Sequence, residues 1–179
     1  MVRFISFIVL FLLCVASSSP TKVVDVETIC KKAKNYSFCI TLLKSKAGGA
    51  GGDLVSLASY TIGVARTDVS KTINLIKTLI AKSGGNPKAL SHYKNCLDHF
   101  GMDEGALGEI VEAQQLLKKG DYGGVNAHAS GILTDVDGCL SGDSPTDPPF
   151  HDTSSLPKYA AIVEQVSQII LIITNFLLH

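Results

Sequence analysis

The sequence has 179 residues, of which 46% are hydrophobic and 18% charged, and its 16 Lys and Arg residues balance 16 Asp and Glu residues. Nucleic-acid-binding proteins normally carry a clustered excess of Lys and Arg, so this balance excludes that class of partner. The absence of Trp and an aromatic content of 7% argue against a sugar-binding groove lined by stacking rings.

The N-terminus has the pattern of a secretory signal peptide. Arg3 gives a short basic start, residues 4–15 form an apolar run, and residues 16–19 are small residues suited to cleavage before Pro20. The apolar run is shorter than the roughly 20 residues that a transmembrane helix needs. We therefore expect residues 1–19 to be removed, and the mature protein to be secreted without a membrane segment.

Four cysteines remain once the signal peptide, with Cys14, is removed: Cys30, Cys39, Cys96 and Cys139. An even number of cysteines in an exported chain predicts two disulfides, and three pairings satisfy that count. Pairing each cysteine with its neighbour in the sequence favours the disulfides Cys30–Cys39 and Cys96–Cys139. A redox role is disfavoured because the first spacing is not Cys-x-x-Cys.

An acceptor motif for N-glycosylation, Asn35-Tyr36-Ser37, lies between the first two cysteines. Such a motif is typical of exposed turns in secreted proteins. We therefore expect Asn35 to be a glycosylation site.

Apolar residues recur at helical spacing in four long segments. The predicted helices cover about 53–82, 88–119, 121–139 and 155–178. Asp53 and Asp121 are candidate N-caps, and Lys118-Lys119-Gly120 is a typical helix end. No segment alternates with the period of two that a strand requires.

Four long amphipathic helices with short connections predict an all-α protein, an up-down-up-down four-helix bundle over residues 48–179. Residues 48–52 are glycine-rich and form a connector. Residues 20–47 would add a small helical hairpin closed by Cys30 and Cys39, so residues 20–179 make one domain.

No arrangement of residues predicts catalysis. His92 and His99 share a helix face with Cys96 but lie about 10 Å apart along the axis, too far to bind one zinc ion. We therefore expect no metal and no cofactor. Cys96 is expected to face inward to its disulfide, and the two histidines are expected to lie beside it near the surface.

Other polar residues do not predict an active site either. Asp135 and Asp137 point to different helix faces and are expected to be solvated, and His128 has no companion nucleophile. The remaining classes are a protein inhibitor, a carrier of an apolar ligand, and a structural protein. The large apolar side chains of the helices suit a filled core better than a carrier's cavity.

The cysteine spacing and one turn resemble the plant invertase and pectin methylesterase inhibitor family over essentially the whole mature chain. The motifs that carry the resemblance are Ile29-Cys30 with eight residues to Cys39, Asn95-Cys96, the run Leu117-Lys118-Lys119-Gly120-Asp121-Tyr122, and Cys139 before a long apolar helix. The resemblance implies the same bundle and hairpin, with nearest-neighbour disulfides.

Within this family, the start of the third bundle helix separates two targets. Invertase inhibitors characteristically carry Pro-Lys-Phe there, whereas this chain has Asp121-Tyr122-Gly123-Gly124-Val125-Asn126, which is similar to pectin methylesterase inhibitors. The resemblance implies a monomeric, secreted cell-wall protein that is not an enzyme and that covers the acidic cleft of a pectin methylesterase without covalent chemistry. An inhibitor of cell-wall or vacuolar invertase is the alternative.

The resemblance implies three enzyme contacts: Asp98, Asp121 and Asn126. From the residues alone, Asp121 is equally well a helix cap and Asn126 a solvated side chain.

The chain also departs from the family pattern. It reads Gly138-Cys139-Leu140-Ser141 where inhibitors usually carry Thr directly before the cysteine and Asp two positions after it. An acidic residue usually found six positions after the third cysteine is Met102 here, and Asp103 follows it, a rotation of 100° along a continuous helix. A non-inhibitory relative, like the pollen proteins with this bundle, is therefore a further alternative.

Overall fold

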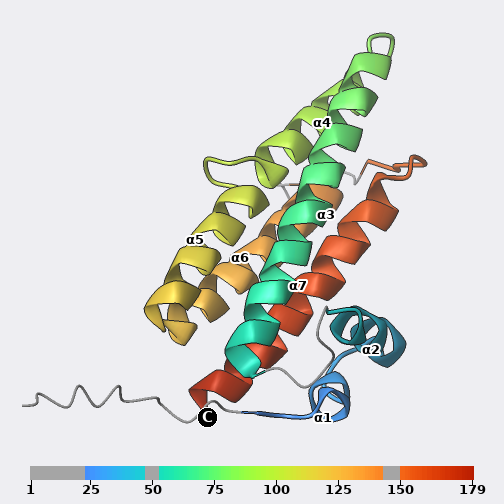
Figure 1. Ribbon diagram of the computed structural model, residues 1–179. Coiled ribbons are helices and arrows are strands. Elements are labelled where there is room, and N and C mark those ends of the chain that lie inside the picture. The colour runs from blue at the N-terminus through green and yellow to red at the C-terminus, as the bar shows by residue number, and fades with distance from the viewer. Residues whose placement is uncertain (1–22, 47–52, 143–149) are drawn as a thin grey trace, which may run out of the picture.

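The structure is a computed structural model that describes residues 23–46, 53–142 and 150–179. These residues form helices and no strand. The predicted signal peptide lies outside the described residues. The helices, shown in Figure 1, are α1 (Val26–Cys30), α2 (Tyr36–Lys44), α3 (Leu54–Lys82), α4 (Pro87–Phe100), α5 (Ala106–Lys119), α6 (Tyr122–Ser141) and α7 (Leu156–Leu178).

Short polar side chains start most of these helices. In five of them, the Asp or Asn before the first residue accepts a hydrogen bond from a backbone N–H of the first turn. These residues are Asp25, Asn35, Asp53, Asn86 and Asp121. At the other end of α5, Gly120 has a φ of 74°, the left-handed conformation that ends helices and that glycine adopts without strain. The capping predicted from the sequence is confirmed.

The long helices form the predicted four-sided bundle, with α4 and α5 placed end to end as a single leg (Figure 1). α3 packs against α4, α5 and α7, and α6 packs against the same three helices. Within the described residues, α3 does not contact α6, and α7 contacts neither α4 nor α5. α7 is therefore diagonal to the leg made of α4 and α5.

The centre of the bundle is filled by apolar side chains, mainly Ile, Leu, Val and Ala. Among the described residues, only α7 is long and apolar enough to cross a membrane. Its inner face is part of this core: Val163, Val166, Ile170 and Ile173 are buried. The length and composition of α7 are thus explained by its place between α3 and α6.

The prediction of one continuous helix over residues 88–119 is wrong, because the chain leaves the helix at residues 101–105. Gly101 and Gly105 flank this break, and glycine is a poor residue for a helix interior. The carbonyl of Gly101 accepts hydrogen bonds from the N–H groups of Leu107 (3.1 Å) and Gly108 (3.3 Å), so the loop folds back on itself.

The break also changes the position of Met102 and Asp103. Both lie in the loop, so the 100° rotation expected for neighbours on a continuous helix does not apply to them. The side chain of Met102 is 51% exposed. An acidic group at position 103 is therefore available at the surface of the break.

A hairpin made of α1 and α2 lies against α3 and α7, on the side of the bundle away from α5 and α6 (Figure 1). The disulfide Cys30–Cys39 closes it. The Asn35 side-chain amide donates a hydrogen bond to Oε1 of Gln165 in α7 at 2.8 Å, and Ser45 and Tyr60 share a hydrogen bond of 2.8 Å between their hydroxyls.

The second disulfide joins Cys96 of α4 to Cys139 of α6, and both residues are fully buried. Both bonds have the nearest-neighbour pairing favoured by the sequence. This covalent link fixes α4 to α6 just before the α4–α5 break.

Candidate functional site

Asp98, the first predicted contact residue, lies in the last turn of α4 and is exposed. Its backbone carbonyl accepts a hydrogen bond from Gly101 N–H at 3.0 Å. Asp98 is thus held beside the break, on a rigid helix end, with its carboxylate open to solvent.

Asp121 and Asn126 both have partners within the fold. Asp121 Oδ1 accepts a hydrogen bond from Gly124 N–H at 2.8 Å as the N-cap of α6. The Asn126 amide donates to Thr174 Oγ1 at 2.9 Å and to Asn175 Oδ1 at 3.2 Å, which ties α6 to α7. The alternative expectation, that Asn126 is only a solvated side chain, is therefore wrong.

The structure does not bring the three predicted residues together. α5 separates the ends at which Asp98 and Asp121 lie, and its 14 residues span about 21 Å. Asn126 directs its amide towards α7 rather than α4. Asp98 and Asp121 are exposed whereas Asn126 is half-buried, so the two acids are better placed than Asn126 to contact a partner.

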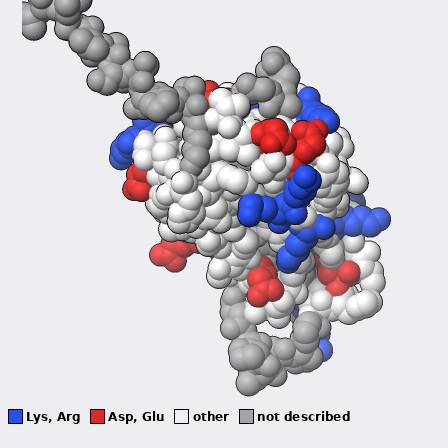
Figure 2. All heavy atoms as spheres, turned by 90° about the horizontal axis from the view of Figure 1, so that it is seen from below, with Lys and Arg blue, Asp and Glu red and all other residues white. Residues whose placement is uncertain are grey.

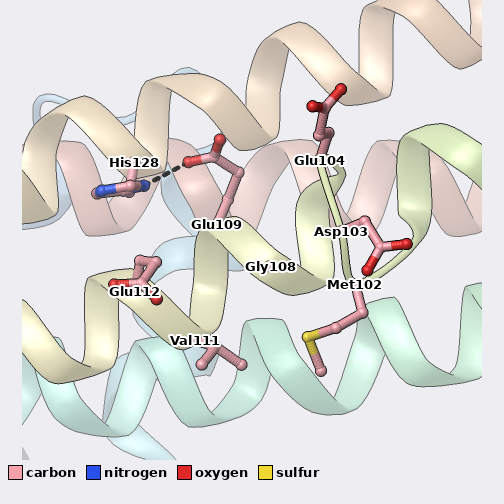
Figure 3. Close-up of a pocket in the computed structure, with 8 residues that line it drawn as sticks. All are labelled: Met102, Asp103, Glu104, Gly108, Glu109, Val111, Glu112 and His128. Atoms are coloured by element: carbon pink, nitrogen blue, oxygen red, sulfur yellow. Dashed lines mark hydrogen bonds and ion pairs between the residues drawn. The ribbon is translucent and has the colours of Figure 1, made fainter.

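A small acidic pocket lies next to the α4–α5 break, as Figure 3 shows. Its volume is about 240 Å³, and it is lined by residues of the loop, α5 and α6: Met102, Asp103, Glu104, Gly108, Glu109, Val111, Glu112 and His128. Glu109 Oε2 and His128 Nδ1 are 2.6 Å apart. This pair joins α5 to α6 and leaves three other carboxylates around it.

A second histidine–carboxylate pair joins α4 to α6. His99 Nδ1 lies 3.5 Å from Oδ1 of Asp135, and the imidazole ring covers Gly138. A Cβ at position 138 would lie 2.5 Å from Cε1 of His99, so any residue other than glycine would force the His99 ring to shift. The departure from the family pattern at Gly138 therefore makes room for the His99 ring.

Asp135 is buried, so its predicted solvation is wrong, whereas Asp137 is exposed as expected. The pKa of Asp135 is raised to about 6, mainly because burial disfavours its charged form and to a smaller extent because Glu109 is nearby; the hydrogen bond and charge of His99 oppose this shift. Oδ2 of Asp135 has no hydrogen-bond partner among the described residues.

The raised pKa of Asp135 predicts that the fold is more stable in mild acid. Because the folded protein holds this proton more tightly than the unfolded chain does, the stabilisation is complete below pH 3.8 and is lost as the pH rises through about 6. We expect Asp135→Asn to reduce the difference in unfolding free energy between pH 5 and pH 7.5 by roughly 1 kcal/mol. Urea denaturation of both proteins at both pH values measures this; an unchanged difference would contradict it.

The side chain of His92 is only 8% exposed, so the expectation that it lies near the surface is wrong. Its Nε2 atom is 3.6 Å from Oδ2 of Asp152, and its ring stacks on Phe150 with centroids 4.6 Å apart. The Tyr93 hydroxyl donates a hydrogen bond to Oδ1 of Asp152 at 3.0 Å. Desolvation lowers the pKa of His92 despite the nearby carboxylate. This cluster holds the segment before α7 against α4.

Within the described residues, no three His, Cys, Asp or Glu side chains form a group that could hold a metal ion. Each of the three histidines of α4 and α6 is close to one carboxylate instead. The sequence did contain a signal for these contacts. His128 and Asp135 are seven residues apart, so they lie on one face of α6, and this spacing predicts polar contacts between that face and a neighbouring helix.

The described residues form an all-α bundle with a disulfide-closed hairpin and an acidic pocket beside the α4–α5 break. The sequence matches the plant invertase/pectin methylesterase inhibitor family over residues 24–173. Because this match covers most of the chain, the protein belongs to that family.

Individual relatives agree with this assignment. Pectinesterase inhibitor 2 of Arabidopsis thaliana is 32% identical over 87% of this chain and 86% of its own length. The pectinesterase inhibitor of Actinidia deliciosa is 29% identical over 85% of this chain and 78% of its own. The crystal structure of a mutant form of a pectin methylesterase inhibitor from Arabidopsis superposes with a TM-score of 0.70 at 29% identity, covering 84% of this chain and 95% of that chain.

Proposed function

We propose that this protein is a secreted inhibitor of pectin methylesterase, which it blocks by non-covalent occlusion of the active-site cleft. The observation that carries the proposal is the similarity to named pectinesterase inhibitors along nearly the full chain, on a fold that matches a solved inhibitor. The protein is not an enzyme itself, and its role is to bind one.

The enzyme-binding face that we propose is formed by the end of α4, the break, and the adjoining parts of α5 and α6. We assign Asp98, Asp103 and the acidic pocket to this face, because Asp98 and Asp103 are both exposed and Asp103 lines the pocket. Asp121, as the cap of α6, borders its far end. Asn126 would act by positioning α6 against α7, and any direct contact with the enzyme would require its amide to leave Thr174.

The rigidity of this face favours binding. The disulfide Cys96–Cys139 and two histidine–carboxylate pairs link α4 and α5 to α6, so little conformational freedom remains to be lost on association. A standard interface of roughly 1,600 Å² on such a face would block a polymer substrate without covalent chemistry.

The compartment and the modification of the protein follow from the same proposal. We infer that the signal-peptide pattern directs the chain out of the cell, that the protein acts in the cell wall as a monomer, and that the exposed Asn35 on the hairpin carries a glycan. Because the hairpin packs on α3 and α7, a glycan there would lie away from the proposed enzyme-binding face.

Inhibition is tested by titrating the mature, oxidised protein separately into a pectin methylesterase and a cell-wall invertase at pH 5 to 6. We expect stoichiometric loss of the esterase activity alone. Asp98→Ala should weaken this inhibition by about ten-fold, because it removes a polar group from the centre of the contact. Glu164→Ala is the matched control, since it removes an acid from α7, diagonal to α4.

The outcome also decides between the targets. An inhibitor that acts on invertase and not on the esterase would overturn the proposal. A relative from Arabidopsis thaliana described as a cell wall / vacuolar inhibitor of fructosidase is 36% identical, but over only 34% of this chain, which makes this target the second candidate. Inhibition of neither enzyme would favour a non-inhibitory bundle protein of the same fold.

A further inference from the structure

The charges of this protein are divided unevenly between the hairpin and the bundle. Residues 23–46 contain five lysines and only two acidic residues, whereas residues 47–179 contain nine Lys and Arg residues and fourteen Asp and Glu residues. A chain with no net charge is thus built from a basic hairpin and an acidic bundle. This segregation creates a local positive field that the overall composition hides.

The positive charge is concentrated at the tip of the hairpin. Lys31, Lys32 and Lys34 lie in the connection between α1 and α2, within four consecutive residues, and all three are exposed. We call these three residues the lysine tip. Figure 2 shows basic side chains gathered on the face seen from below, the end of the molecule at which the hairpin lies in Figure 1.

Contacts within the protein neutralise little of this charge. Lys34 is 82% exposed, and its Nζ atom is 4.0 Å from Oε1 of Glu164, the limit of an ion pair. Lys32 lies over the ring of Phe176, 5.5 Å from its centroid, which leaves its charge in place. Lys44, elsewhere on the hairpin, is paired with Glu27 at 2.8 Å, so it adds less to the patch.

The hairpin fold makes the lysine tip a fixed feature. The disulfide Cys30–Cys39 brackets the connection, and the cap of α2 formed by Asn35 fixes its end. Three ammonium groups are therefore held on one short turn rather than on a flexible tail. Binding by such a preordered group of charges loses less conformational entropy than binding by a disordered segment.

We propose that the lysine tip binds a linear polyuronate, the carboxylate-bearing form of the polymer on which pectin methylesterase acts. Ammonium groups suit carboxylates that are spread along an extended chain, because they act as point charges without a bidentate geometry. Several weak ion pairs along one polymer add to a useful affinity. The partner's identity rests on the proposed function, since removal of methyl esters is what leaves carboxylates on the polymer.

The position of the tip permits simultaneous binding of enzyme and polymer. The hairpin contacts α3 and α7, whereas the proposed enzyme-binding face is formed by α4, α5 and α6. The inhibitor would therefore be retained where the polymer has already lost its methyl esters, which is where the enzyme has been active.

The test measures retention of the mature, oxidised protein on immobilised polygalacturonate and on highly methyl-esterified pectin, at low salt. We expect retention on polygalacturonate only, reversed by salt because exposed charges are screened. The variant Lys31→Gln/Lys32→Gln/Lys34→Gln should bind at least about ten-fold more weakly. Equal binding of both polymers, or an unchanged affinity of the variant, would overturn the proposal.

A matched control removes the same charge from the opposite end of the bundle. Lys77, Lys82 and Lys88 are exposed on α3 and α4, and replacing all three by Gln should leave retention within about two-fold of the wild type. Equal losses in both variants would show binding to net charge and overturn the assignment to the hairpin.

Esterase inhibition by the same variants separates this inference from the proposed function. With a short soluble methyl-esterified substrate, we expect the lysine-tip variant to inhibit like the wild type. A protein that inhibits no esterase but binds polygalacturonate through its lysine tip would refute the proposed function alone. A protein that inhibits the esterase but shows no lysine-dependent retention would refute the polymer-binding proposal alone.

Discussion

Replacing both Cys96 and Cys139 by alanine is expected to lower the free energy of unfolding by about 4 kcal/mol. The bond closes a loop with a sequence separation of 43 residues, and the chain-entropy relation gives a larger effect for longer loops. Both cysteines are fully buried between α4 and α6, so the loss of packing adds to the effect. Urea denaturation of the variant and the wild type measures the difference.

The first disulfide provides the comparison for this prediction. Cys30 and Cys39 are separated by nine residues, so replacing both by alanine should cost about 3 kcal/mol on the same relation, and should loosen the hairpin. A larger loss of unfolding free energy on replacing Cys30 and Cys39 than on replacing Cys96 and Cys139 would contradict the prediction that the longer loop gives the larger effect.

Replacing Gly105 by alanine is expected to destabilise the protein by roughly 2–3 kcal/mol. A Cβ at this position would lie 2.5 Å from the carbonyl oxygen of Asp98 and 2.6 Å from that of His99. Both are backbone atoms, which cannot rotate away as a flexible side chain can. The break would open, and Asp98 would shift with it. We therefore expect weaker esterase inhibition together with a lower midpoint of urea denaturation.

Gly63→Ala is the control, because nothing lies within 4 Å of a Cβ at that position in α3. Alanine there should raise the free energy of unfolding by about 0.5–1 kcal/mol, since glycine costs more backbone entropy in a helix. If Gly105→Ala were as well tolerated as Gly63→Ala, the close packing of the break would be refuted.

The fold was predictable because its signals are local. Helical spacing of apolar residues, Asp53 and Asp121 as caps, and the Gly120 helix end are each contained within a few residues of sequence. The cysteine spacing in an exported chain allowed three disulfide pairings and favoured the nearest-neighbour one that the structure contains. These features depend on residues close together in the sequence, and not on how the helices are rotated relative to one another.

The α4–α5 break was missed because the apolar spacing continues across it. Phe100 and Ile110 are both buried in the core, so the pattern of apolar residues resembles that of one helix. The conflicting signal was the pair Gly101 and Gly105, which lowers helix propensity at both ends of a five-residue stretch. Tertiary packing on α3 and α6 holds the two halves in line without helical hydrogen bonds between them.

The site was less predictable because its contacts cross between helices. Glu109 and His128 are 19 residues apart in the sequence, and His99 of α4 reaches Asp135 of α6 with its ring packed on Gly138. Whether Asp135 is solvated or buried depends on the rotation of α6 relative to α4, which a single sequence does not specify. The same rotation directs the Asn126 amide towards α7 rather than towards a partner.

The break between α4 and α5 also affects how this chain can diverge. In an uninterrupted helix, one inserted residue rotates everything after it by 100° and would turn the apolar side of α5 out of the core. At residues 101–105 a loop absorbs a change in length, so the register of α5 and of the turn at Gly120 is preserved. The exposed residues 102–104, between the closely packed Gly101 and Gly105, are therefore the place in the leg made of α4 and α5 where a change in chain length would disturb the core least.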